Sequence, residues 1–162
     1  MARAIGLAAV GASLLVLAGC SSLPEITAPA AAPPSSAGAA RPSPYPVEKL
    51  VGAWGMSSYR QDKDRKRTEA MARVQCKLPY VIKKGPTDGV MMHVADDAKL
   101  YELTLKGSAS GKTYLGFNSP PGDPADREIL SFSDNLIVMK FVDPDADNRY
   151  GKVIYVRCGA NG

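Results

Sequence analysis

The single histidine, His93, is the first candidate for a catalytic or metal-binding residue, because an imidazole can act as a base or bind a metal near neutral pH. A Ser-His-Asp triad is formally possible, but no GxSxG segment or other nucleophile signature accompanies it. A metal site would need further ligands that the sequence does not supply. With period-two alternation, His93 lies opposite Met92 and beside Met91, which predicts a surface or barrel-lumen position. We therefore expect a non-catalytic protein without metal or cofactor.

Residues 107–113 (GSASGKT) are similar to a phosphate-binding loop but depart from its spacing. Three residues separate the two glycines, where the GxxxxGK[ST] motif has four. The segment also lies between two predicted strands, so no helix N-terminus would supply the amide groups that hold a phosphate. The pattern predicts a hairpin turn.

Residues 143–148 (DPDADN) carry three carboxylates at alternate positions, as calcium loops do. Calcium requires six to eight oxygen ligands, but the sixth position here is Asn148 and the twelfth is Ile154, where an EF-hand has Gly and Glu. We expect a solvated turn that joins two strands.

The N-terminus has the order of an export signal. Arg3 precedes an uncharged run of residues 4–18, which is shorter than the roughly 20 residues of a membrane-spanning helix. Residues 17–20 (LAGC) resemble the lipobox of bacterial lipoproteins. This resemblance implies that residues 1–19 are a signal peptide and that Cys20 is lipidated and membrane-anchored. Ser21 resembles the outer-membrane sorting pattern, which implies a place in the cell envelope on the periplasmic side of the outer membrane. The alternative is an ordinary signal peptide cut near Ala18, with Cys20 in a disulfide.

Residues 20–46 should form the lipidated cysteine and its tether. The segment after Cys20 contains seven of the 13 prolines, seven alanines and only two charged residues. Such a composition cannot bury enough apolar surface to offset the entropy of ordering it. A single globular β domain is then expected over residues 47–162, which is long enough for one core.

Cys76 and Cys158 form an even pair once Cys20 is assigned to lipid. An exported protein meets an oxidising compartment, so we expect a disulfide between them. The alternative is a reactive thiol or a metal-binding pair, but no CxxC spacing is present.

Elements that could position these residues are mostly strands. Residues 61–76 predict a short amphipathic helix after the first strand, capped by Asp62 or Asp64, because Arg67, Ala70, Met71 and Val74 share one face; a strand over residues 68–76 is the alternative. The other segments are short, β-branched or aromatic, and separated by turn residues. The eight predicted strands are residues 54–59, 80–83, 90–94, 100–105, 113–117, 129–132, 136–142 and 153–158.

This spacing predicts a mainly β fold, an antiparallel meander of about eight strands closed as a small barrel or folded as a sandwich. The helix would suit a barrel with one end plugged. Residues 52–54 (GAW) are similar to the Gly-x-Trp of lipocalins, although a Trp in an ordinary core also explains them. Residues 79–96, 114–116 and 126–128 resemble small uncharacterised lipoproteins of alphaproteobacteria, a resemblance that implies no functional residue.

Charge is unevenly distributed along the domain. Residues 60–84 contain nine Lys or Arg and three acidic residues, whereas residues 85–162 contain eight and eleven. A basic face can attract anionic lipid headgroups or an acidic partner; solvation of an exposed helix is the alternative. We expect no nucleic-acid binding, since no recognition motif is present. The candidate contact residues are Lys63, Arg65, Lys66, Arg67 and Arg73.

These observations predict a membrane-anchored, non-catalytic module that binds another component of the cell envelope, either an anionic component or a protein. One alternative is a small barrel that carries an apolar ligand in a lumen lined by residues such as Met91, Tyr101 and Met139. Another is an inhibitor of a lysozyme or protease, with the turn at residues 120–123 as the inserting loop.

Overall fold

The computed structural model describes residues 40–159. The predicted signal peptide, Cys20 and residues 21–39 of the predicted tether lie outside the described residues. Among the residues that are described, no helix combines the length and apolar character needed to cross a bilayer.

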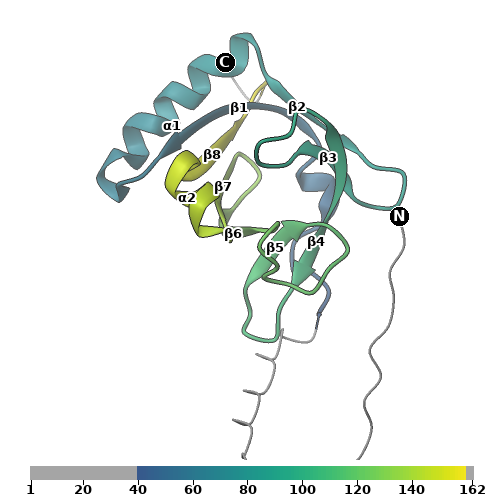
Figure 1. Ribbon diagram of the computed structural model, residues 1–162. Coiled ribbons are helices and arrows are strands. Elements are labelled where there is room, and N and C mark those ends of the chain that lie inside the picture. The colour runs from purple at the N-terminus through teal and green to yellow at the C-terminus, as the bar shows by residue number, and fades with distance from the viewer. Residues whose placement is uncertain (1–39, 160–162) are drawn as a thin grey trace, which may run out of the picture. The chain divides into compact units, whose positions relative to one another are not determined.

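Eight antiparallel strands form a closed barrel, and each strand pairs with its neighbours in sequence (Figure 1). Pairing of β1 with β8 closes the sheet, with Trp54 opposite Arg157 and Tyr59 opposite Lys152. This confirms the predicted mainly β meander and selects the barrel over the sandwich. The strands are β1 (Gly52–Tyr59), β2 (Tyr80–Lys84), β3 (Val90–His93), β4 (Leu100–Gly107), β5 (Thr113–Gly116), β6 (Arg127–Phe132), β7 (Leu136–Phe141) and β8 (Lys152–Arg157).

Alternate residues of the strands fill the barrel, as the period-two pattern of a half-buried strand requires. On β3, for example, Val90 and Met92 are fully buried, whereas Met91 between them is only partly covered. The buried core consists of Leu50, Trp54, Ile82, Val90, Met92, Leu103, Leu115, Ile129, Ile137, Met139 and Tyr155.

One end of the barrel is closed by the segment before β1. The 3-10 turn Val47–Lys49 leads to Leu50, which is fully buried and accepts a 2.8 Å hydrogen bond from the Trp54 indole. The Arg157 guanidinium lies 4.1 Å from the centre of the Trp54 ring and donates to main-chain oxygens of Val51, Lys49 and Asp134. This segment is the plug, and not the helix after β1 as the sequence had suggested.

Helix α1 (Arg65–Val74) follows β1, with 3-10 turns at Asp62–Asp64 and Gln75–Lys77. The helix is confirmed, so the alternative strand over residues 68–76 is wrong. It packs on the outside of the barrel against β1 and β8, over a second apolar cluster. That cluster consists of Tyr59, Ala72, Val138, Ile154 and Val156.

The face of α1 that meets the barrel is not the face that the apolar periodicity indicates. Thr68 and Ala72 are buried, whereas Met71 and Val74 are half exposed or more. The reason is a close approach: a Cβ on Gly55 of β1 would lie 1.9 Å from the Ala72 main-chain oxygen. Only small side chains fit at such a contact, so the larger apolar residues of the helix face solvent.

A second helix, α2 (Pro144–Tyr150), stands where we predicted a solvated turn, so that prediction is wrong. Asp143 caps it, because its Oδ1 accepts a 2.7 Å hydrogen bond from the Ala146 amide. Pro144 is the first residue of the helix, where a backbone N–H would have no partner within the helix, so its missing N–H costs no hydrogen bond. Gly151 ends the helix at φ 68°, in the region that favours glycine.

The segment 107–113 forms the β4–β5 hairpin as predicted. The Ser108 amide donates to the Lys112 oxygen at 2.9 Å, and Gly111 takes φ 81° at the tip. Beside the hairpin, the main chains of Arg41 and Gly107 each donate a hydrogen bond to the other. The Tyr45 ring stacks on the Phe132 ring, with 4.3 Å between their centres. The last residues of the predicted tether therefore contact the barrel.

Two long-range links fix the fold. Cys76, after α1, and Cys158, after β8, place their Sγ atoms 1.98 Å apart, which is the distance of the predicted disulfide. The second link is a buried ion pair between Lys106 on β4 and Asp126 just before β6, with Nζ and Oδ1 2.6 Å apart. Because Asp126 adjoins Arg127, this ion pair fixes the start of β6.

Candidate functional site

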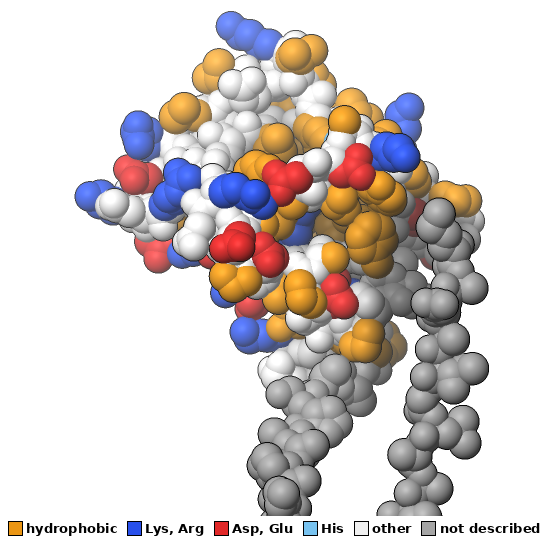
Figure 2. Space-filling model, in the orientation of Figure 1, with side chains coloured by type: hydrophobic (Ala, Val, Ile, Leu, Met, Phe, Trp, Pro, Cys, Tyr) orange, Lys and Arg blue, Asp and Glu red, His pale blue; other side chains and the backbone are white. Residues whose placement is uncertain are grey.

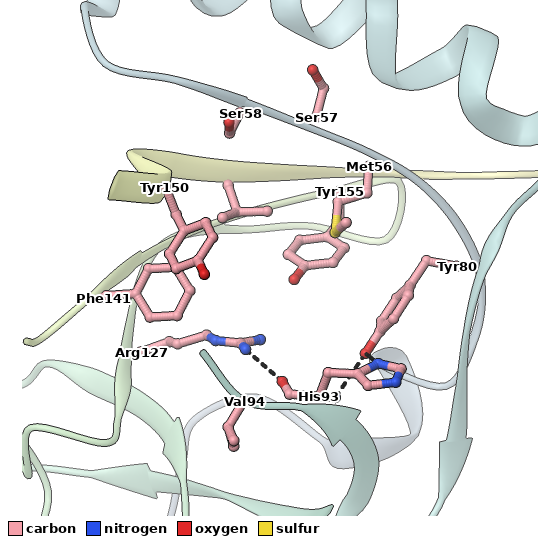
Figure 3. Close-up of a pocket in the computed structure, with 11 residues that line it drawn as sticks. Met56, Ser57, Ser58, Tyr80, His93, Val94, Arg127, Phe141, Tyr150 and Tyr155 are labelled. Carbon is pink, nitrogen blue, oxygen red and sulfur yellow. Dashed lines mark hydrogen bonds between the residues drawn. The ribbon is translucent and has the colours of Figure 1, made fainter. Parts of the chain in front are cut away.

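The end of the barrel that residues 47–50 do not plug contains a cavity of about 490 Å³. Ligand sites usually have about 300–1,000 Å³ and mostly apolar walls. The lining side chains come from β1, β2, β3, β6, β7, β8 and α2, and Figure 3 shows several of them converging on one space. They are Met56, Ser57, Ser58, Tyr80, His93, Val94, Arg127, Phe141, Tyr150, Val153 and Tyr155.

Among residues 40–159, Arg127 is the only Lys or Arg that lines this cavity. It is 6% exposed, and its guanidinium lies 4.9 Å from the centre of the Phe141 ring. Within the described residues it donates one side-chain hydrogen bond, to the main-chain oxygen of His93, and no carboxylate pairs with it. Since a guanidinium has five N–H groups, most of its donor capacity is unused.

Tyr155 places a second donor beside Arg127. The residue is 3% exposed, and its ring and hydroxyl project from β8 into the cavity (Figure 3). No partner for this hydroxyl is found among residues 40–159. Burial raises the pKa of the Tyr155 phenol, while the charge of Arg127 opposes this rise. The phenol is therefore a neutral donor at physiological pH.

His93 is held at the rim by Tyr80. The Tyr80 hydroxyl accepts a 3.0 Å hydrogen bond from the His93 amide and lies 3.1 Å from His93 Nδ1. Within the described residues, the hydrogen-bond partner of the imidazole is therefore a phenol. Figure 3 shows the Ser57 hydroxyl pointing away from the cavity. The arrangement fixes a wall of the cavity.

Helix α2 supplies the remaining side of the cavity. Its Tyr150 lines the space and donates a hydrogen bond to Asp96, which also pairs with Arg149 at 2.5 Å. The hydrogen bond to Asp96 raises the pKa of Tyr150. These contacts tie the loop after β3 to α2, so the position of Tyr150 depends on an exposed carboxylate.

The predicted basic contact residues lie elsewhere, on the exposed side of α1 and the turn before it. Arg67 pairs with Asp64 at 3.2 Å and Arg73 with Glu69 at 2.5 Å. Within the described range, Lys63, Arg65 and Lys66 have no salt bridge. The structure thus gathers this basic set on α1 and the turn before it, and does not bring it to the cavity.

The three residues predicted to line the lumen of an apolar carrier, Met91, Tyr101 and Met139, lie in three different environments. Met139 is fully buried and fills the core, and Tyr101 packs against the core with its hydroxyl donating to Asp97 at 2.5 Å. Met91 pairs with Lys83 and Glu102 on the outer face, so its placement in the lumen is wrong.

The turn at residues 120–123 is folded back onto the barrel. Pro121 is buried, and the Gly122 and Asp123 amides donate to Asp126 Oδ2 at 2.9 and 3.2 Å. These contacts hold the turn against the barrel, whereas an inhibitor that inserts a loop would need the turn to protrude.

Sequence reasoning missed Arg127, Tyr155 and α2 as parts of one site. A signal for the arginine was present: period-two alternation puts Arg127 on the same face as Ile129, which predicts a charged side chain among inward-facing apolar ones. Convergence with Tyr155 was not visible, because it depends on closure of the barrel between distant strands.

Comparisons with known proteins identify no relative: no family model, no curated protein and no solved structure matches the chain. In the part of the chain that the structure describes, no group of three or more His, Cys, Asp or Glu is placed to hold a metal ion. The cavity is thus the site with the most defined chemistry: apolar and aromatic walls around two unused hydrogen-bond donors.

Proposed function

We propose that this protein is a non-catalytic binding module of the bacterial cell envelope, anchored by a lipid on Cys20, and that its barrel mouth binds a small amphiphile with an anionic group. The observation that carries the ligand class is Arg127. Its guanidinium faces the cavity, and within the described residues its partners are one carbonyl and the Phe141 ring, so a cation without a charged partner stands where a ligand would enter. An incoming carboxylate or phosphate would supply the missing charge.

The walls around Arg127 favour an amphiphile as the ligand rather than a simple inorganic anion. Met56, Val94 and Val153 are apolar, and Phe141 and Tyr155 add aromatic faces. An alkyl or aromatic body would bury these surfaces at about 25 cal/mol per Å². The Tyr155 hydroxyl would give a second hydrogen bond to the anionic group, next to the guanidinium.

Calorimetric titration with three ten-carbon probes tests the ligand class. Decanoate should bind, whereas decanol and decylammonium should bind far more weakly, because only the carboxylate satisfies Arg127. Arg127→Met should weaken decanoate binding roughly 10- to 100-fold, the range for a hydrogen bond to a charged group. Arg127→Lys should restore part of it, and Lys140→Met, which removes an outward-facing cation of β7, should not change it.

Thermal unfolding of each variant separates loss of binding from loss of fold. Equal affinities of wild type and a folded Arg127→Met variant for decanoate would overturn the proposal. Binding of decanol as tight as that of decanoate would also overturn it, since the charge would then have no role.

The anchor is tested separately by labelling cells with a palmitate analogue. Wild type should incorporate the label and sediment with membranes, and Cys20→Ala should do neither. Label and membrane association that persist in Cys20→Ala would refute the lipoprotein assignment without bearing on the cavity.

A further inference from the structure

The exposed side of α1 combines apolar and basic side chains in a way that packing against the barrel does not explain. Met71, Val74 and Leu78 are 50%, 60% and 84% exposed. Met71 and Val74 are three residues apart and lie on one side of α1, and Leu78 follows the 3-10 turn after the helix. Hydrophobic and basic side chains follow the upper left edge of Figure 2, where Figure 1 places α1.

The fold holds these apolar residues outward. The close contact between Gly55 and the Ala72 main chain fixes which side of the helix meets β1, and the link between Cys76 and Cys158 fixes the segment after it. Rotation of α1 to bury Met71 and Val74 would break both arrangements. Their exposure is therefore a fixed feature of the surface.

Cations lie at the N-terminal end of this apolar stripe, where Asp64 at the N-cap pairs with Arg67 alone. Arg65, Lys66 and Arg67 occupy the first turn of α1, which has no acidic residue. The positive end of the helix dipole disfavours cations there. Within the described residues, Lys63, Arg65 and Lys66 have no carboxylate partner. An external anionic surface would offset both the repulsion from the dipole and the mutual repulsion of these charges.

We infer that this surface, the docking face formed by Lys63, Lys66, Arg67, Met71, Val74 and Leu78, binds the headgroup region of an anionic lipid bilayer. A helix with apolar side chains flanked by cations lies in the membrane interface, where the apolar groups enter the acyl boundary and the cations meet phosphates. The inference rests on the proposed envelope location but not on the cavity ligand. The docking face would hold the barrel against the membrane, beyond what a tether alone imposes.

Tryptophan quenching by brominated acyl chains tests the docking face in the full chain. Leu78→Trp reports from the apolar stripe, and Leu130→Trp, on β6 and 42% exposed as leucine, is the matched control. Trp54 is fully buried and gives a constant background. Each purified protein is reconstituted into vesicles of brominated phosphatidylcholine, with or without phosphatidylglycerol.

Quenching of Leu78→Trp, but not of Leu130→Trp, in vesicles that contain phosphatidylglycerol is the expected result. High salt should reverse it, because screening removes the attraction. Replacing Lys63, Lys66 and Arg67 together by Gln should lower the docked-to-free ratio roughly 100-fold. The matched variant, with Gln at Lys83, Lys99 and Lys140, should retain the quenching.

Two results would overturn the inference. Equal quenching at positions 78 and 130 in every vesicle would show that α1 does not meet the bilayer. Protection of the position-78 tryptophan from a soluble quencher in detergent, rising with protein concentration, would assign the face to a second copy of the chain. Flotation with vesicles of phosphatidylcholine alone reports the Cys20 anchor independently, so failure of the anchor and failure of the docking face are distinguishable.

Discussion

Asp126→Asn should be one of the most destabilising conservative substitutions in the domain, because it breaks a buried ion pair. The Asp126 and Lys106 side chains are 0% and 8% exposed, with Nζ and Oδ1 2.6 Å apart. The other carboxylate oxygen accepts hydrogen bonds from the Gly122 and Asp123 amides. Loss of the negative charge leaves the Lys106 ammonium buried with only neutral acceptors from Phe117 and Ser119.

Removing one partner of a buried pair costs about 3–5 kcal/mol, against a total stability of about 5–15 kcal/mol for a domain. Removing both charges should be much less harmful, since neither group is then left uncompensated. The double variant Lys106→Met with Asp126→Asn should therefore recover most of the loss. Because Asp126 adjoins Arg127, the single variant should also weaken decanoate binding, through displacement of the start of β6.

Urea unfolding followed by circular dichroism, with the disulfide kept oxidised, measures these effects. The single variant should unfold at a urea concentration lower by roughly 2 M, given a slope of about 2 kcal/mol per M. A loss of less than about 1 kcal/mol for the single variant, or a double variant no more stable than the single one, would contradict the argument.

Three further predictions follow from the packing and the titrating groups. Gly55→Val should lower stability by about 1–3 kcal/mol in urea unfolding, because the side chain overlaps the Ala72 main chain; unchanged stability would mean that α1 can move away. Replacing Cys76 and Cys158 by Ser should cost about 4–5 kcal/mol for a loop of this length and leave decanoate affinity unchanged, and a loss of affinity would show that the link shapes the cavity. The raised folded-state pKa of Tyr155 contributes stability that is present below about pH 10 and is lost as pH rises through the folded value; Tyr155→Phe should flatten this alkaline decline in thermal unfolding between pH 8 and 11, and an unchanged decline would contradict it.

The strands could be predicted from sequence because their signal is local. Alternation such as that of Val90 and Met92 marks one face of each strand, and glycine and proline clusters mark the turns. The number and spacing of the strands predicted a barrel or a sandwich, and only the pairing of β1 with β8 in the structure decides for the barrel. The helix after β1 could also be predicted, but its buried face could not, since that face depends on the contact of Gly55 with Ala72 across the structure.

Helix α2 illustrates a different error. Its signals were local and present: an Asp cap at Asp143, a proline next to it and Gly151 at the end. The alternating carboxylates drew the interpretation toward a metal loop or a solvated turn, and a seven-residue helix is too short for periodicity to decide. Tyr150, which α2 carries to the cavity, was missed with it.

Two inward-facing arginines show how a structural residue differs from one available for binding. Arg157, at the plugged end, stacks on Trp54 and donates to three main-chain oxygens. Arg127, at the open end, stacks on Phe141 and donates to one. Within the residues that the structure describes, the same side chain thus donates three hydrogen bonds at one end of the barrel and one at the other. Arg157 is committed to the main chain around the plug, whereas the remaining donors of Arg127 face the cavity and are free to bond to solvent or to the anionic ligand that we propose.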